Sequence, residues 1–248
     1  MRRTNKILTF LLLSIVIFTF GCAKEPTVQP VMKPEKVVEA FLKAASEGNV
    51  DTCLSLLTED VVFRQEPSGT SVSGRSQIEA GIRQQAAWHQ QYLVVGPVTT
   101  EGNTVKLTIR QTGDDCQIMG LEYITGNLEV QVQDGKIKSW TVTMNQQDLK
   151  KVTELIAGGI GIKYEATAQG IKVTEMAKNS PAYEAGLRPG DLIIAVNGVK
   201  YSQMREGEIQ LRIKGPVGSK VKLSTTHEGA PVPVEIEVTR VALEQLRW

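Results

Sequence analysis

Between residues 35 and 150, apolar residues are spaced first for helices and then for strands. Spacings of three and four residues predict a helix that ends at Gly48, a second short helix capped by Asp51 and running to Leu57, and a third that carries Ile78 and Ile82. Beyond Gly102, apolar and polar residues alternate, which predicts strands. The alternating apolar residues are Val105, Leu107, Ile109, Leu128, Val130, Val132, Trp140, Val142 and Met144. Helices followed by antiparallel strands are typical of an α+β domain with a curved sheet around the leading helices.

Two segments of this first domain carry a family resemblance. They are "VVEAFLKAASEGNVDTCLSLLTEDVVF" at Val37–Phe63 and "SVSGRSQIEAGIRQ" at Ser71–Gln84. Together they resemble the nuclear-transport-factor-2-like superfamily, in its SnoaL-like branch. The resemblance implies a cone over residues 35–150. The open end of such a cone holds an acid/base catalyst, a small ligand or nothing. Two copies of a cone domain can pair through its sheet.

An acid/base enzyme would need a carboxylate or a histidine among apolar walls of the cone. Five side chains are candidates for this group: His89, Asp114, Asp115, Glu122 and Tyr123. We expect His89 at a helix end in water, and Asp114 and Asp115 in a turn beside Gly113. No set of residues stands at catalytic spacing, so we predict no catalytic residue and favour a ligand-binding or interaction role.

Beyond Leu155, the pattern predicts short strands separated by tight turns. Ile160, Ile162 and Tyr164 alternate as one strand, and a second strand begins at Ile171. The run "KNSPAYEAGLRPGDLIIAVNG" then supplies local signals for a helix, a turn, a strand and a hairpin. Ser180 is suited to cap a short helix with Pro181 at its first position, and Gly186 to stop it. The apolar strand Leu192–Val196 ends in the hairpin pair Asn197-Gly198.

This order of signals resembles a PDZ domain of the kind found in bacterial carboxy-terminal-processing proteases. "GIGI" at Gly159–Ile162 and "GPVGSKVKLSTTHEG" at Gly215–Gly229 extend the resemblance. It implies a small, partly open β-barrel with two helices over residues 151–241, whose partners are protein or peptide C-termini. The implied peptide-binding residues are Gly159, Ile160, Gly161, Ile162, Tyr164, Ile209 and Ile213. The loop N–H groups would bind a partner's terminal carboxylate, and the partner would add as a strand beside Ile162–Ala166.

Two other interpretations of "GGIGIKY" at Gly158–Tyr164 need weighing. A phosphate-binding loop places its glycines after a strand and at the start of a helix, whereas these glycines precede a strand, so that interpretation is disfavoured. A plain turn without a ligand stays open. The helix that would border the binding pocket also departs from the family, because it contains Gly207, Gln210 and Arg212.

The first residues predict export and lipidation. Arg2, Arg3 and Lys6 precede an apolar run from Ile7 to Phe20 that is shorter than the roughly 20 residues of a membrane span. "FTFGC" at Phe18–Cys22 resembles a lipobox, which implies lipidation of Cys22. We therefore expect a signal sequence over residues 1–22, a proline-containing tether over 23–34 and a location in the cell envelope.

Composition and charge argue against nucleic acid as a partner, and they leave the pairing of the two remaining cysteines open. The chain has 248 residues, 41% hydrophobic and 22% charged, and a net charge of +1, which gives no reason to expect nucleic acid. Residues 35–150 carry 10 Lys/Arg against 15 Asp/Glu, and residues 151–248 carry 13 against 11, as two separate domains would. Cys53 and Cys116 suit a disulfide or two free thiols equally, and neither predicts a metal site. We expect no cofactor.

Residues 242–248 read as a short C-terminal tail, with no room for a protease domain beyond Arg240 and no serine-protease motif before it. The sequence therefore predicts a membrane-tethered, non-enzymatic adaptor with a peptide-binding PDZ domain. The alternative is a cone domain that binds, isomerises or hydrates a small ligand, with the PDZ domain recruiting partners.

Overall fold

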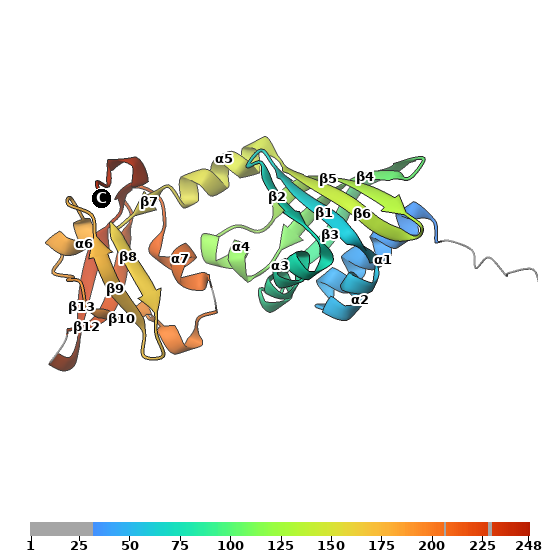
Figure 1. The fold of residues 1–248 in the computed structure, drawn as a ribbon. Helices are drawn as coiled ribbons and strands as arrows, with labels where there is room; N and C mark the ends of the chain where they lie inside the picture. Colours follow the sequence, from blue (N-terminus) through green and yellow to red (C-terminus); the bar gives the residue numbers. More distant parts are fainter. Residues whose placement is uncertain (1–31, 206, 228–229) are drawn as a thin grey trace, which may run out of the picture. The chain divides into compact units, whose positions relative to one another are not determined.

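The computed structural model describes residues 32–248 except residues 206 and 228–229 (Figure 1). The predicted signal sequence, Cys22 and the tether up to residue 31 lie outside the described residues. Of the helices within the described ranges, none combines the length and apolar character needed to cross a membrane.

The first domain is one six-stranded curved sheet with three helices packed against its inner face (Figure 1). Its elements are α1 (Pro34–Ser46), α2 (Val50–Ser55), β1 (Leu57–Glu66), β2 (Thr70–Ser73), α3 (Arg75–Ala87), β3 (Gln91–Glu101), β4 (Thr104–Thr112), α4 (Asp114–Met119), β5 (Ile124–Gln133) and β6 (Lys136–Met144). The strand order is β2-β1-β6-β5-β4-β3. β1 pairs with β6 in parallel, and the other neighbours are antiparallel.

The apolar alternation read from the sequence forms the core of this domain. Val105, Leu107 and Ile109 of β4 and Leu128, Val130 and Val132 of β5 are all buried. They face buried residues of the helices, namely Val37, Val38, Leu42, Ile78 and Ile82. The predicted α+β fold is therefore confirmed, because side chains two apart on a strand share one face of the sheet.

Two local features of the first domain differ from the sequence-based expectation. The predicted cap Asp51 is wrong: Asn49 caps α2, its Oδ1 accepting from the Thr52 N–H at 3.0 Å, and the helix ends at Ser55 because Leu57 begins β1. The spacing did not predict β3, which lies at the sheet edge with mostly exposed side chains and therefore lacks alternation. An edge also tolerates Pro97, where the pairing register shifts.

Helix α5 (Gln146–Leu155) follows β6 and leads into the second domain, so the predicted boundary at residue 150 falls inside a helix. The second domain contains β7 (Gly158–Gly159), β8 (Ile162–Ala166), β9 (Ile171–Met176), α6 (Pro181–Glu184), β10 (Leu192–Val196), β11 (Val199–Lys200), η1 (Tyr201–Gln203), α7 (Glu208–Ile213), β12 (Lys220–His227), β13 (Ala230–Thr239), β14 (Val241–Ala242) and η2 (Leu243–Gln245). Its main sheet runs β13-β12-β10-β9-β8, and β14 pairs with β7.

The local signals of the second domain are confirmed. Ser180 caps α6, with its Oγ accepting from the Tyr183 N–H at 3.3 Å, and Pro181 begins that helix. Asn197 and Gly198 both have positive φ, as the tight hairpin between β10 and β11 requires. Ile171, Val173, Leu187, Ile193, Val221 and Leu223 form the centre of a separate core. The two domains thus each bury their own apolar residues.

Candidate functional site

The glycine loop of the second domain is held at its start by backbone pairing on two sides. Gly158 and Gly159 pair with Ala242 and Val241 of β14. Gly158 also exchanges two hydrogen bonds with Gly215: its N–H donates to the Gly215 carbonyl at 2.7 Å, and its carbonyl accepts at 3.2 Å. The loop therefore enters β8 from a fixed starting point.

The two residues at the centre of the loop use their carbonyls but not their N–H groups. The Ile160 carbonyl accepts from the Ala182 N–H at 3.2 Å and from Ser180 Oγ at 2.9 Å, and the Gly161 carbonyl accepts from the Ala177 N–H at 2.9 Å. Within residues 32–248, apart from the three left undescribed, neither N–H has an acceptor. Both residues are buried, and an unpaired buried N–H costs about 1–3 kcal/mol. An anion bound at this point would satisfy both donors.

The glycines are required by the chain's own packing, which the sequence analysis did not foresee. Gly161 has φ of +75°, and a Cβ there would lie 3.0 Å from both Leu246 Cδ2 and Ser180 Oγ. A Cβ on Gly159 would lie 2.6 Å from Leu243 Cδ2. The structure thus places the C-terminal segment against these positions.

That C-terminal segment is anchored by backbone hydrogen bonds. The Lys178 N–H donates to the Arg247 carbonyl at 2.7 Å, and the Arg247 N–H donates to Asn179 Oδ1 at 2.9 Å. The Leu243 N–H donates to the Ala157 carbonyl at 3.2 Å. The predicted tail is thus a structural part of the second domain and supports the glycine loop.

The other predicted peptide-binding residues lie in the same hydrophobic cluster. Ile162 and Tyr164 of β8 and Ile209 of α7 are partly buried against the core, and burial raises the pKa of Tyr164. Among the described strands, β8 pairs only with β9 and ends the sheet, so its outer edge lacks a strand partner. Ile213 is only 5% exposed and belongs to the core.

Helix α7 differs from the family pattern at Gly207 and Arg212, and local structure accounts for both residues. It begins after Gly207, which has φ of +80°, and has only six residues. Arg212, which stands where the family is usually apolar, forms an ion pair with Glu208 one turn earlier, at 2.6 Å between Nη2 and Oε1. The Glu208 side chain is 5% exposed and that of Arg212 is 20% exposed, so a buried carboxylate has a half-buried partner.

Arg240 anchors the end of α7 and was missed by sequence reasoning. Its Nε donates to the Ile213 carbonyl at 2.8 Å, and its Nη2 donates to the Arg212 carbonyl at 2.9 Å. Its Nη1 donates to the Lys220 carbonyl at 2.8 Å and to Ser219 Oγ at 3.0 Å. A positive charge at a helix C-terminus is favourable, and here one buried side chain ties the end of α7 to β12.

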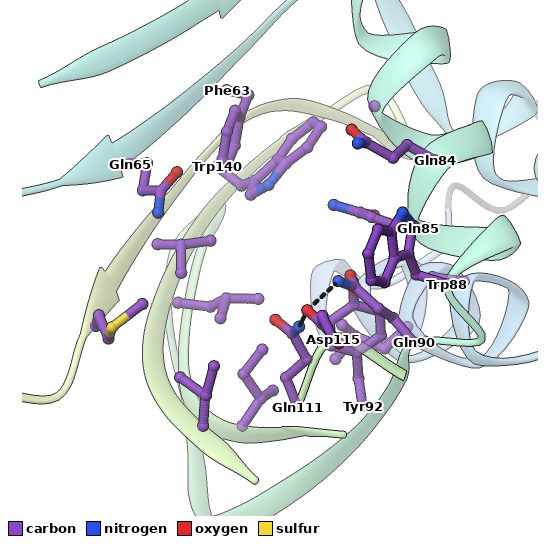
Figure 2. A pocket seen from close by; sticks show the side chains of 18 of the residues that line it. Phe63, Gln65, Gln84, Gln85, Trp88, Gln90, Tyr92, Gln111, Asp115 and Trp140 are labelled. Carbon is purple, nitrogen blue, oxygen red and sulfur yellow. Dashed lines mark hydrogen bonds between the residues drawn. The ribbon is translucent and has the colours of Figure 1, made fainter. Parts of the chain in front are cut away.

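The first domain contains a cavity of about 570 Å³ at the concave side of its sheet (Figure 2). Three aromatic side chains gather at one end, where Trp140 lies 5.6 Å from Phe41 and 5.3 Å from Phe63 between ring centroids. Two more, Trp88 and Tyr92, lie beside Gln90 and Asp115 (Figure 2). Five glutamines of the first domain also line the cavity: Gln65, Gln84, Gln85, Gln90 and Gln111. The cone is therefore not filled by its own side chains.

Of the five acid/base candidates, only Asp115 lines the cavity. It lies in the first turn of α4, not in the predicted turn, and its Oδ2 accepts from Gln90 Nε2 at 2.8 Å and from Gln111 Nε2 at 3.1 Å (Figure 2). Tyr92 of β3, which sequence reasoning missed, donates to Gln90 Oε1 at 2.9 Å, and burial raises the pKa of its hydroxyl. No local spacing signals this network, because its members come from three separate elements.

The remaining candidates lie elsewhere. His89 is 73% exposed, as expected, and its Nδ1 lies 2.7 Å from Asp114 Oδ2. The hydrogen bond from His89 lowers the pKa of Asp114. Glu122 is exposed, and Tyr123 stacks under the Arg110 guanidinium at 4.2 Å from the ring centroid.

The question of the two cysteines is settled in favour of free thiols. Cys53 and Cys116 are both buried and unpaired. Burial raises the pKa of Cys53 to about 11 and that of Cys116 to about 12, so both are thiols at neutral pH. Across the described ranges, no group of three or more His, Cys, Asp or Glu side chains is placed to hold a metal ion.

Comparisons with known proteins match the two domains separately. A SnoaL-like domain profile matches residues 38–140, and a PDZ domain profile matches residues 146–226. A solved NTF2-like protein of unknown function from Cytophaga hutchinsonii covers 48% of this chain and 96% of its own, at 18% identity and a TM-score of 0.40.

Curated relatives resemble this chain over its PDZ region. A carboxyl-terminal-processing protease from Synechocystis is 34% identical over 87 residues, which are 35% of this chain and 20% of the relative. The protease CtpA from Bacillus subtilis is 35% identical over 107 residues, 39% of this chain and 23% of the relative. The chain thus spans about a fifth of the length of these two relatives. It consists of a SnoaL-like domain followed by a PDZ domain that is homologous to the PDZ domain of carboxy-terminal-processing proteases.

Proposed function

We propose that the PDZ domain binds the C-terminal carboxylate of a partner protein at the N–H groups of Ile160 and Gly161. The observation that carries this proposal is the pair of buried loop N–H groups without acceptors. A carboxylate would accept from both, and hydrogen bonds to a charged group contribute about 1.5–3 kcal/mol each. The last residues of the partner would add as a strand along the open edge of β8, with a terminal apolar side chain near Ile162 and Ile209.

A comparison of peptides with free and amidated C-termini tests this function. The chain from Lys24 onward is titrated with fluorescent C-terminal peptides, each in both forms. We expect amidation to weaken binding by about tenfold or more, because an amide carries no charge and offers one acceptor fewer. Equal affinity for both forms would show that the peptide binds elsewhere or through its side chains alone.

We further propose that the protein is an adaptor tethered to a membrane through lipidated Cys22, on the extracytoplasmic side of the cell envelope. The support is the N-terminal pattern of basic residues, short apolar run and "FTFGC". The tether would hold the two domains away from the lipid surface. Pairing of two copies through the cone domain stays a prediction of the family resemblance.

Replacing the lipidated residue tests the tether. In Cys22→Ser, we expect the protein to move from the detergent-extracted membrane fraction to the soluble fraction, because one hydroxyl cannot carry the acyl chains that hold a lipoprotein. Cell fractionation with immunoblotting measures the change, with Cys53→Ser as the control that keeps Cys22. Unchanged membrane retention of Cys22→Ser would indicate an uncleaved signal anchor instead.

A second candidate function is the binding of a small ligand in the cone domain. The cavity favours it, because an aromatic end and a polar end face one open space of about 570 Å³ (Figure 2). Acid/base chemistry on such a ligand would fall to Asp115 or Tyr92, the titratable side chains of the first domain that line the cavity. Both already hydrogen-bond to glutamine side chains, which favours binding over proton transfer.

A further inference from the structure

The polar end of the cone cavity is oriented to accept hydrogen bonds (Figure 2). Asp115 Oδ2 accepts hydrogen bonds from the side-chain amide N–H groups of Gln90 and Gln111. Since the Gln111 amide nitrogen faces the carboxylate, its oxygen is left as an acceptor without a donor among the described residues. The Gln90 oxygen is occupied by the Tyr92 hydroxyl. A ligand that reaches this end therefore meets a carboxylate and an amide oxygen, and it needs its own N–H or O–H donors.

The charge of the cavity is not balanced. Asp115 is the one charged side chain among the described residues that line it. Its Oδ1 is buried without a hydrogen-bond partner among the described residues, and the neighbouring Asp114 is engaged by His89 and by an ion pair with Arg205. A carboxylate in largely apolar surroundings is stabilised most by a positive charge, because the surroundings screen the attraction poorly.

The opposite end of the cavity suits a flat apolar group. Trp140 packs between Phe41 and Phe63 with tilted rings, which leaves aromatic faces and edges along the wall. Gln65 and Gln85 stand between the two ends, and their side-chain amides form no hydrogen bond with other described residues (Figure 2). A ligand that spans the cavity would combine an apolar ring with a polar, positively charged head.

We propose that the cone cavity binds a small organic amine, with its ammonium group at Asp115 and Gln111 and its planar apolar body against Trp140 and Phe63. This inference rests on the second candidate function, small-ligand binding in the cone, and is independent of peptide binding by the PDZ domain. Stacking on the aromatic wall and the ion pair at Asp115 would act at opposite ends of one molecule.

Three probes with one ring and different head groups test the ligand class. Tryptamine carries an ammonium group, tryptophol a hydroxyl and indole-3-acetate a carboxylate on the same indole. Isothermal titration calorimetry on the full chain is expected to give at least about tenfold tighter binding of tryptamine than of tryptophol, and the weakest binding of indole-3-acetate. Tryptamine is expected to lose this preference in Asp115→Asn and to retain it in Glu129→Gln, a matched change at an exposed carboxylate of β5.

The outcomes distinguish the amine class of the ligand from the existence of a small-ligand site in the cone. If all three probes bind equally, the amine class is wrong, and if the tryptamine preference survives in Asp115→Asn, the ammonium group does not bind at Asp115; in either case a small-ligand site in the cone stands. If none of the three binds to the full chain, the amine site and the cone-ligand function both fail. Unchanged hydrogen exchange of the β4 and β5 amides in Asp115→Asn is the check that the cone domain of this variant is folded.

Discussion

Gly161→Ala is expected to weaken the binding of C-terminal peptides by about tenfold or more. Gly161 has φ of +75°, where a residue with a Cβ loses about 1–2 kcal/mol. The added Cβ would also lie 3.0 Å from Leu246 Cδ2 and Ser180 Oγ and 3.1 Å from Ser180 Cα. Because backbone is among these neighbours, the loop must move, and its N–H groups would leave the positions that a carboxylate needs. Fluorescence titration with a free C-terminal peptide measures the loss.

Gly198→Ala is the matched control for this prediction. Gly198 has φ of +79°, nearly the same as Gly161, but a Cβ there would have no atom within 4 Å. It lies in the β10–β11 hairpin, away from the glycine loop. We expect both variants to lose similar stability from the strained φ, and only Gly161→Ala to lose affinity. Equal affinity losses in the two variants would attribute the effect to general destabilisation and contradict a role of the loop geometry.

The double variant Gly161→Ala/Leu246→Ala isolates the contribution of the C-terminal segment. Removing the Leu246 side chain frees one of the two sides on which the new Cβ is crowded, while Ser180 remains. We therefore expect partial recovery of peptide affinity relative to Gly161→Ala. No recovery would mean that Ser180 and the strained φ account for the whole effect.

Arg240→Met is expected to destabilise the PDZ domain by about 3 kcal/mol or more. The substitution keeps most of the apolar stem but removes the donor from three carbonyls, in a buried position at Ile213 and in partly buried positions at Arg212 and Lys220. Each unsatisfied buried acceptor costs about 1–3 kcal/mol, although water that enters the site would recover part of this. Hydrogen exchange of β12 and β13 amides, together with urea unfolding, reports the stability of this domain apart from the cone.

Two further variants sharpen this test. Arg247→Met removes a guanidinium from an exposed position, and we expect its urea midpoint to match that of the unaltered chain. Arg240→Lys keeps the charge but replaces the planar guanidinium by a single ammonium group, which cannot reach acceptors on α7 and β12 together. We therefore expect Arg240→Lys to recover only a minor part of the stability that Arg240→Met loses. A fully stable Arg240→Lys would show that charge at the end of α7 matters more than the planar guanidinium.

Much of the fold follows from patterns within short stretches. The alternation around Leu107 and Val130 places one apolar face on each strand, and a sheet with one apolar face must bury it. Ser180-Pro181 and Asn197-Gly198 act through neighbouring backbone atoms, so their roles can be predicted without knowledge of the rest of the chain. Local patterns are less decisive where two neighbouring residues can both cap a helix. The predicted cap of α2 was Asp51, whereas Asn49, two residues earlier, caps the helix.

The sequence by itself determined the two-domain organisation, the α+β class of each domain and the loop at Gly159–Ile162 as the place to look for a peptide site. Only the tertiary structure decided that Leu246 and Ser180 crowd Gly161, that Arg240 anchors α7, and that Asp115, Gln90 and Gln111 meet in one cavity. Periodicity and turn signals report interactions between residues close in sequence. The contacts of Gly161, Arg240 and Asp115, in contrast, join residues from separate elements. No local spacing encodes where the packing of the two cores brings these residues together.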